Sequence, residues 1–329
     1  MTNQSAHSTP PYTQESDFEQ AIQLNIAELW QRRNEGFIKT KDKKQLFWIS
    51  LTSSQHTKAI VVVNGRIECT HKYQELFYDL FQQGYDIYSY DHRGQGLSER
   101  LIEDQQMGYV DEFADYVDDL ELLVESFKLD HYKKRYLIGH SMGGNVVTRY
   151  VQTRPDHPFD ALALTAPMFG VNMAWYLRPI ASLLGQLLTA VNSKPTFAPG
   201  QAAYYPKPFI DNRLSQSSVR YHWFRDLYQQ MPELQIGGAS TRWVWQGLMA
   251  SKQCLLLTRQ IKVPLLLLQA GDDQIVSNTD QIRFIKKLAK TNHQCALQIV
   301  HGARHELLFE QDQYRNQTLD TTLNFFAQH

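Results

Sequence analysis

Short apolar runs alternate along the chain with longer stretches in which apolar residues recur every three or four positions. The runs are typical of strands in a buried parallel sheet, and the longer stretches are typical of amphipathic helices. The predicted strands are residues 59–63, 85–90, 136–139, 162–166, 264–269 and 296–300. The predicted helices are residues 17–33, 73–84, 111–128, a segment after residue 141, 279–290 and 313–326. Between the helix of 17–33 and the strand of 59–63, residues 36–52 look like an antiparallel pair of strands.

The order of these elements predicts an α/β fold, in which helices cover both faces of a mostly parallel, doubly wound sheet. The alternation stops at Pro167 and resumes at Val263. We therefore expect residues 168–259 to form a cap or lid inserted into one core, which is made of residues 17–167 and 260–329. Residues 1–16 are polar and are expected to be a flexible N-terminal segment. Ser16 and Glu19 predict a capping box at the start of the first helix.

Composition narrows the class of protein further. The 329 residues carry a formal net charge of -1, which gives no general attraction to nucleic acid, and 43% of them are hydrophobic. The N-terminal residues lack the basic and apolar regions of a signal peptide, and no uncharged apolar run reaches the roughly 18 residues of a spanning helix. Cys69, Cys254 and Cys295 are far apart and odd in number, which predicts reduced thiols in a cytoplasmic protein.

A Gly-x-Ser-x-Gly motif lies between a predicted strand and a predicted helix. Gly139, Ser141 and Gly143 occupy its three defined positions. In this context the turn is so sharp that the two flanking positions have no room for side chains, and the serine hydroxyl projects from the end of the strand. Ser141 is therefore predicted to be a nucleophile.

A serine nucleophile needs a base, and the base needs an orienting carboxylate. In a strand–serine–helix protein of this kind, the carboxylate and then the histidine follow the serine along the chain. Asp273 follows the first strand after the cap and is the predicted acid, with Asp272 as the alternative. His305 lies in the loop after the last strand and is the predicted base, whereas His301 is predicted to be structural.

The oxyanion of the reaction needs two backbone donors. The amide of Met142 begins the helix after the serine, and the amide of Arg66 follows Gly65 at the end of the first core strand. We predict these two amides as the oxyanion hole. The Arg66 side chain has two possible roles: it holds a structural carboxylate, or it reaches a phosphate of the substrate.

Other candidate residues are predicted to have structural roles. The loop from Asp91 to Ser98 is rich in turn formers, and its Asp91 and Arg93 are expected to lock it to its neighbours. His140 is expected to shape the turn around the serine. The chain has no metal-ligand spacing and no glycine-rich phosphate cradle before a helix, so the sequence predicts neither a metal nor another cofactor.

Five segments carry a resemblance to a known family. They are 64–68 (Asn-Gly-Arg-Ile-Glu), 91–96 (Asp-His-Arg-Gly-Gln-Gly), 140–144 (His-Ser-Met-Gly-Gly), 164–170 (Leu-Thr-Ala-Pro-Met-Phe-Gly) and 302–306 (Gly-Ala-Arg-His-Glu). They resemble the α/β-hydrolase superfamily, and within it the monoacylglycerol-lipase and lysophospholipase branch with the bacterial lysophospholipases of the L-two type. The resemblance implies hydrolysis of the acyl ester of a single-chain lipid, through an acyl-serine and without a cofactor. It also implies a peripheral position on the inner face of the cytoplasmic membrane. Asn64 departs from the His that many members of the superfamily have there.

The predicted cap has a charge of its own. Residues 171–259 contain nine Lys or Arg and three Asp or Glu, so 9 − 3 gives a net charge of +6. We expect the cap to offer an acyl-chain tunnel and a basic rim that attracts an anionic membrane or a phosphate headgroup. The candidates for contact with the acyl chain are Trp175, Leu184 and Trp223. The oligomeric state stays open.

Overall fold

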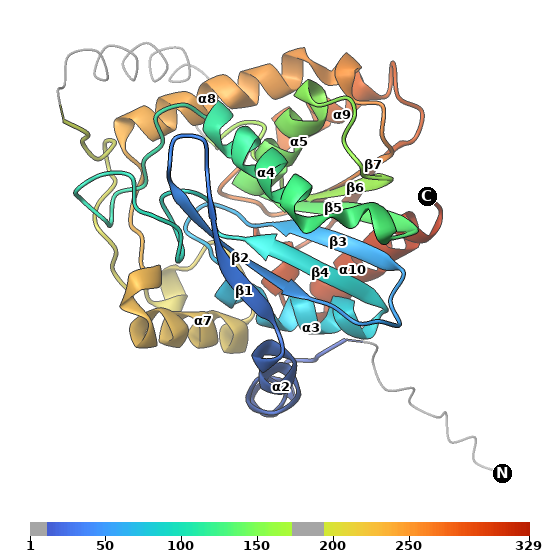
Figure 1. The fold of residues 1–329 in the computed structure, drawn as a ribbon. Coiled ribbons are helices and arrows are strands. Elements are labelled where there is room, and N and C mark those ends of the chain that lie inside the picture. Colours follow the sequence, from blue (N-terminus) through green and yellow to red (C-terminus); the bar gives the residue numbers. More distant parts are fainter. Residues whose placement is uncertain (1–11, 173–193) are drawn as a thin grey trace.

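A single mixed sheet forms the centre of the molecule (Figure 1). The computed structural model describes residues 12–172 and 194–329, and all bounds below refer to them. The strands are β1 (Asn34–Lys39), β2 (Gln45–Leu51), β3 (Lys58–Val63), β4 (Tyr85–Tyr90), β5 (Lys134–His140), β6 (Ala161–Thr165), β7 (Leu265–Ala270) and β8 (Cys295–Val300). Their order across the sheet is β1-β2-β4-β3-β5-β6-β7-β8. Only β2 runs antiparallel to its neighbours β1 and β4; all other described pairs are parallel.

Helices cover both faces of the sheet (Figure 1). One face carries α3 (Gln74–Gln82) and α10 (Asp312–Ala327), and the other carries α4 (Ala114–Phe127), α5 (Met142–Thr153) and α9 (Asn278–Leu288). Strands β3, β6 and β7 are buried almost throughout because helices exclude water from both of their faces. The α/β architecture predicted from the sequence is confirmed, and the carboxyl ends of β3, β5, β7 and β8 meet at one edge of the sheet.

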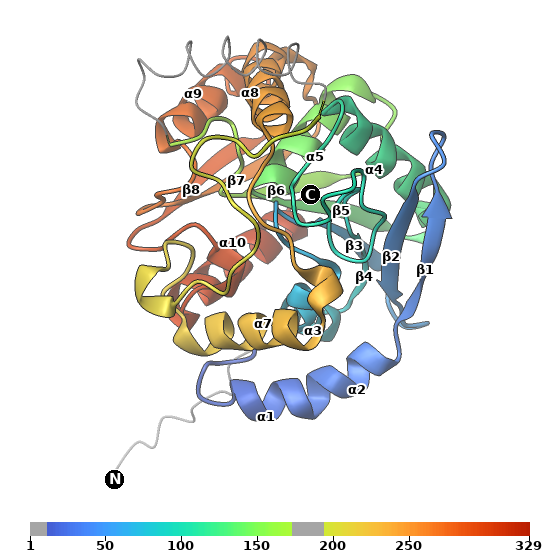
Figure 2. The same cartoon turned by 90° about the vertical axis from the view of Figure 1, so that its left-hand side faces the viewer.

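The N-terminal helix differs from its prediction. Residues 17–33 form two helices, α1 (Phe18–Gln23) and α2 (Asn25–Gln31), and the chain breaks between them at Leu24. The predicted capping box is wrong, because the N-cap residue makes no side-chain hydrogen bond to the helix. Phe18 of α1 packs against Trp223, whereas α2 packs against α3. The break therefore accompanies packing against two separate elements, which spacing in the sequence does not reveal. Figure 2 shows α1 and α2 following one another below the sheet, with α7 above α1.

Two long helices lie within the described part of residues 168–259, which is 168–172 and 194–259. They are α7 (Ser218–Gln230) and α8 (Thr241–Leu256), and the described part of this segment adds no strand to the sheet. Helix α8 packs against α5, and its Trp243 and Cys254 belong to the main hydrophobic core. The division of the chain into core and cap stays a prediction. None of the described helices is both long enough and apolar enough to cross a bilayer.

Candidate active site

The chain turns sharply between β5 and α5, and Ser141 lies at the tip of the turn. Its φ of 53° and ψ of -116° are unusual for a residue with a side chain, so the surrounding structure must hold this conformation in place. A Cβ at position 143 would lie 2.2 Å from the carbonyl oxygen of Val63, and one at position 139 would lie 2.9 Å from the carbonyl oxygen of Gly143. The two glycines of the motif are therefore required by close backbone packing.

Three side chains from separate loops form one hydrogen-bonded chain. Ser141 Oγ lies 3.0 Å from Nε2 of His305, and Nδ1 of His305 lies 2.7 Å from Oδ2 of Asp273. The other oxygen of Asp273, Oδ1, accepts backbone hydrogen bonds from Ile275 at 2.7 Å and Val276 at 3.0 Å. These two amides fix the orientation of the carboxylate, whose side chain is fully buried.

His305 and Asp273 stabilise each other's charged forms. Burial opposes protonation of His305, but the carboxylates around it, Asp273 first and then Glu306 and Glu68, together raise the pKa of the imidazole above its ordinary value. Burial likewise works against ionisation of Asp273, but His305 and the two backbone amides lower the pKa of the carboxyl. Asp272, the alternative acid, is exposed at the surface. The geometry therefore brings Asp273, and not Asp272, to the histidine.

The other two histidines near the site, His140 and His301, are not part of the hydrogen-bonded chain. Nδ1 of His140 lies 3.1 Å from both the carbonyl oxygen and the hydroxyl of Thr165, and burial lowers the pKa of His140 to about 4. Its ring packs against that of His305, with 5.0 Å between centroids. His301 is exposed in the turn after β8.

Two backbone amides that follow the carboxyl ends of β3 and β5 make no hydrogen bond within the described part of the chain. No hydrogen bond from the amide of Arg66 or Met142 is found among the described residues, although Met142 is completely buried. The amide of Gly65 donates to Oε2 of Glu68 at 2.5 Å, so it is not available to a substrate. Gln95 also fixes this loop, through Nε2 contacts of 2.8 Å and 2.9 Å to the carbonyl oxygens of Gly65 and Glu68.

Sequence reasoning missed a buried charge cluster behind the histidine. Nζ of Lys72 lies 2.8 Å from a carboxylate oxygen of Glu68 and 2.7 Å from one of Glu306, and the Tyr73 hydroxyl donates to Glu68. Burial disfavours the ionised form of both carboxyl groups. Lys72 nevertheless lowers the pKa of Glu68 below its ordinary value, whereas the pKa of Glu306 stays above its ordinary value. The four-residue spacing of Glu68 and Lys72 was the available signal, since it is typical of an ion pair on one helical face.

The structure places only one of the three residues predicted to contact the acyl chain. Trp175 and Leu184 lie outside the described residues. Trp223 packs edge-on against Phe18, with 5.9 Å between ring centroids, and lines a cavity of about 890 Å³ between α1 and α7. Neither the serine, the histidine nor the aspartate of the hydrogen-bonded chain lines that cavity.

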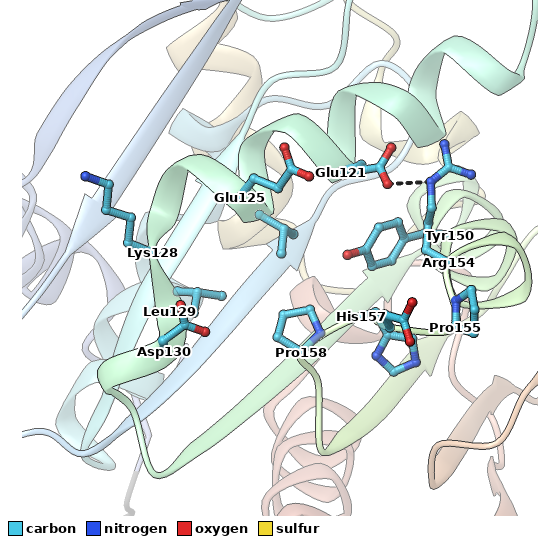
Figure 3. Close-up of a pocket in the computed structure, with 12 residues that line it drawn as sticks. Glu121, Glu125, Lys128, Leu129, Asp130, Tyr150, Arg154, Pro155, His157 and Pro158 are labelled. Carbon is cyan, nitrogen blue, oxygen red and sulfur yellow. Dashed lines mark hydrogen bonds and ion pairs between the residues drawn. The ribbon is translucent and has the colours of Figure 1, made fainter.

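Another cavity, of about 460 Å³, lies beside α4 and the end of α5 (Figure 3). Its lining includes Glu121, Tyr150 and Arg154, and Nε of Arg154 lies 2.6 Å from a Glu121 oxygen. The arginine is thus paired with a carboxylate, and burial raises the pKa of Tyr150 so that its phenol is neutral. No activated nucleophile lies among the residues that line this cavity. The candidate active site is the edge of the sheet around Ser141, where the three side chains form their hydrogen-bonded chain.

A serine on a strand–turn–helix elbow, followed along the chain by an aspartate and a histidine on later strand ends, defines an α/β hydrolase. Comparison with known families agrees. The model of the family described as serine aminopeptidase, S33 matches residues 54–312, and the chain belongs to this family.

Individual proteins similar to this chain include lipid hydrolases. The chain is 34% identical over 325 residues to lysophospholipase L2 of Escherichia coli (strain K12), covering 96% of this chain and 94% of that protein. It is 27% identical over 256 residues to monoglyceride lipase of Homo sapiens, covering 76% of each. Among solved structures, a soluble variant of monoglyceride lipase from Saccharomyces cerevisiae with a substrate analogue has a TM-score of 0.71 at 16% identity, covering 90% of this chain and 94% of that one. This last likeness shows the fold.

Proposed function

We propose that this protein is a serine hydrolase that cleaves the acyl ester of a lysophospholipid. The observation that carries the proposal is the hydrogen-bonded chain of Ser141, His305 and Asp273. The similarity to lysophospholipase L2 over nearly the whole length of both chains supports the substrate class.

In the proposed reaction, Ser141 Oγ attacks the ester carbonyl carbon while Nε2 of His305 takes the hydroxyl proton. Asp273 holds Nδ1 of the imidazole and stabilises the positive charge that forms on the ring. The free amides of Arg66 and Met142 donate to the developing oxyanion. His305 then gives its proton to the leaving glycerol oxygen, which departs and leaves an acyl-serine.

Water completes the cycle. His305 removes a proton from a water molecule as this water attacks the acyl carbon, and the two amides again bind the oxyanion. Collapse of the second tetrahedral intermediate breaks the bond to Oγ, and His305 returns the proton to Ser141. The products are a fatty acid and the glycerol-containing headgroup, and the reaction consumes no cofactor.

A monoacylglycerol is the second candidate substrate, because monoglyceride lipases are also among the relatives of the chain. Turnover of a lysophosphatidylcholine and of a monoacylglycerol with the same acyl chain separates the two. We expect the higher kcat/KM for the lysophospholipid; a preference for the monoacylglycerol would favour the second candidate.

A fluorophosphonate probe tests the serine itself. The wild-type protein should be labelled, and Ser141→Ala should abolish labelling and activity while the protein keeps its thermal unfolding transition. Folded wild-type protein that does not react with the probe would instead indicate a non-catalytic α/β-hydrolase scaffold.

We also propose peripheral contact with an anionic membrane. The segment around the 3₁₀ turn Phe209–Asp211 exposes Ile210 and Tyr205, which are 90% and 59% accessible, and Arg213 is exposed nearby. Not all of the positive charge of residues 171–259 serves such a surface, because Arg220 is buried against Glu75. Each basic residue near an anionic surface contributes about 1 kcal/mol.

Vesicle sedimentation tests this contact. Vesicles that contain an anionic phospholipid should bind the protein more tightly than neutral vesicles, and salt should weaken the binding. Ile210→Ser should bind the anionic vesicles more weakly than the wild type does at the same salt concentration. Equal binding to both kinds of vesicle at every salt concentration would exclude the proposal.

A further inference from the structure

The Arg66 side chain has no carboxylate partner. Every Asp and Glu of the chain lies within the described residues, and none forms an ion pair with Arg66. Buried arginines elsewhere in the molecule each form an ion pair with a carboxylate at 2.6–2.8 Å; they are Arg93 with Asp119, Arg220 with Glu75 and Arg315 with Asp79. Of the two roles that the sequence left open for this side chain, a structural ion pair is therefore excluded.

The guanidinium of Arg66 is nevertheless held in one place. Nη1 donates to the carbonyl oxygen of Gly237 at 3.3 Å, and the guanidinium carbon lies 5.2 Å from the centre of the Trp243 ring. Gly237 and Gly238 are themselves fixed, because their amides donate to the carbonyl oxygens of Gln106 and Ala202 at 2.7 Å. These contacts occupy one edge and one face of the guanidinium, and the residue stays partly exposed.

The local electrostatics leave this cation uncompensated. The titratable group that acts electrostatically on Arg66 is Tyr116, and its phenol is kept neutral because burial raises its pKa. Burial lowers the pKa of Arg66 to about 10, so the guanidinium is charged at neutral pH. A partly desolvated positive charge without a counter-ion costs free energy, and an anionic ligand with oxygen acceptors recovers that cost.

We propose that the Arg66 guanidinium binds the phosphate of the substrate's headgroup and thereby makes the enzyme select lysophospholipids over monoacylglycerols. The proposal rests on the proposed function. The residue is suited to this role because its backbone amide is a proposed donor to the ester oxyanion. In a lysophospholipid the phosphate and the ester share one glycerol unit, so one residue contacts the reacting carbonyl through its backbone and the headgroup through its side chain.

The test is a ratio of two rates. Octanoyl lysophosphatidylcholine and monooctanoylglycerol are compared below their aggregation concentrations, and the quantity is kcat/KM for the first divided by kcat/KM for the second. A charge-assisted contact of this kind corresponds to a change of about 10- to 100-fold. Arg66→Met should lower the ratio by that factor, and Arg66→Lys should restore part of it because the charge is kept and the planar fork is lost.

The ratio separates headgroup binding from damage to the loop. A displaced backbone donor would lower both rates by the same factor and leave the ratio unchanged, which would overturn the proposal. Arg242→Met is the matched control: Arg242 lies on α8 and is already paired with Asp111 at 2.9 Å, so the ratio and both rates should stay at wild-type values. A fall in the ratio with Arg242→Met as large as that with Arg66→Met would also overturn the proposal, because it would show an effect of overall charge.

Two further arms complete the experiment. If inorganic phosphate inhibits the wild type and not Arg66→Met while the ratio is unchanged, the guanidinium binds free phosphate and the headgroup assignment is wrong. If the wild type hydrolyses both substrates and only the ratio fails to change, the further inference falls and the proposed function stands. If the wild type hydrolyses neither substrate, both fall.

Discussion

Substitution of the buried aspartate by its amide gives the sharpest test of the proposed mechanism. In Asp273→Asn the side chain keeps its size, and its oxygen can still accept the amides of Ile275 and Val276 at the position of Oδ1. The new NH₂ group then replaces Oδ2, which lies 2.7 Å from Nδ1 of His305. Because an NH₂ group only donates, the imidazole must present an unprotonated Nδ1 to it and carry its proton on Nε2.

This tautomer cannot accept a proton from Ser141. The structure therefore predicts a loss much larger than that of one hydrogen bond, which is about 1 kcal/mol. An aspartate-to-asparagine change in a serine protease triad, which fixes the wrong tautomer in the same way, lowers kcat by roughly 10⁴-fold. We expect a loss of the same order, equivalent to about 5 kcal/mol of transition-state stabilisation.

The assay is hydrolysis of a chromogenic short-chain ester and of a lysophospholipid, with thermal unfolding measured on the same samples. Asp272→Asn is the matched control, since Asp272 is exposed and next in sequence; it should keep activity within about threefold of the wild type. A folded Asp273→Asn protein that loses less than tenfold, or an Asp272→Asn protein that loses as much, would refute the assignment of the acid.

Three further predictions concern pH, backbone packing and buried charge. The kcat/KM of the wild type should fall with decreasing pH as His305 becomes protonated. Because Asp273 raises the pKa of His305, the pH at which kcat/KM is half its maximum should lie above 6.5. A half-maximal pH below 6.5 would contradict this prediction. Gly143→Ala should prevent folding or abolish fluorophosphonate labelling, because the new Cβ would lie 2.2 Å from a backbone oxygen. Gly247→Ala in α8 is the control, since the nearest atom to its Cβ would be 3.5 Å away. It should leave the free energy of unfolding in urea unchanged or raise it by up to about 1 kcal/mol. Lys72→Met leaves two buried carboxylates without a counter-ion and should lower the free energy of unfolding by about 3–5 kcal/mol. A loss below about 1 kcal/mol, the most expected of an exposed ion pair, would show that the cluster is not stabilised by its lysine.

Much of the sheet was predictable because burial imposes a pattern on each strand separately. Residues 59–63 and 264–269 are continuous apolar runs, and both are strands buried on two faces. For these strands, the residues that decide the structure are neighbours in sequence. The serine elbow was predictable from its motif, although the steric demand on Gly143 comes from the carbonyl oxygens of Val63 and Asn64 at the end of β3.

The remainder depended on contacts between distant residues. The interruption of the first helix at Leu24 has no glycine or proline to signal it, and it accompanies the packing of α1 and α2 on different partners. In the cluster of Glu68, Lys72 and Glu306, the ion pair of Lys72 with Glu306 joins positions 234 apart, so local spacing could signal only the pair of Glu68 and Lys72. The absence of a carboxylate partner for Arg66 likewise becomes visible only when all the acidic groups have been placed.

The bond from the Gly65 amide to Glu68 has a consequence for catalysis at low substrate concentration. Glu68 and Gln95 hold this loop through contacts within the protein alone, so its conformational entropy is lost when the chain folds. Binding then has little left to order at the reacting carbonyl, and rigid, preorganised donors of this kind strengthen association and speed the chemical step together. Dispersed single molecules of a short-chain ester should accordingly be turned over without any aggregate or bilayer to assemble the donors.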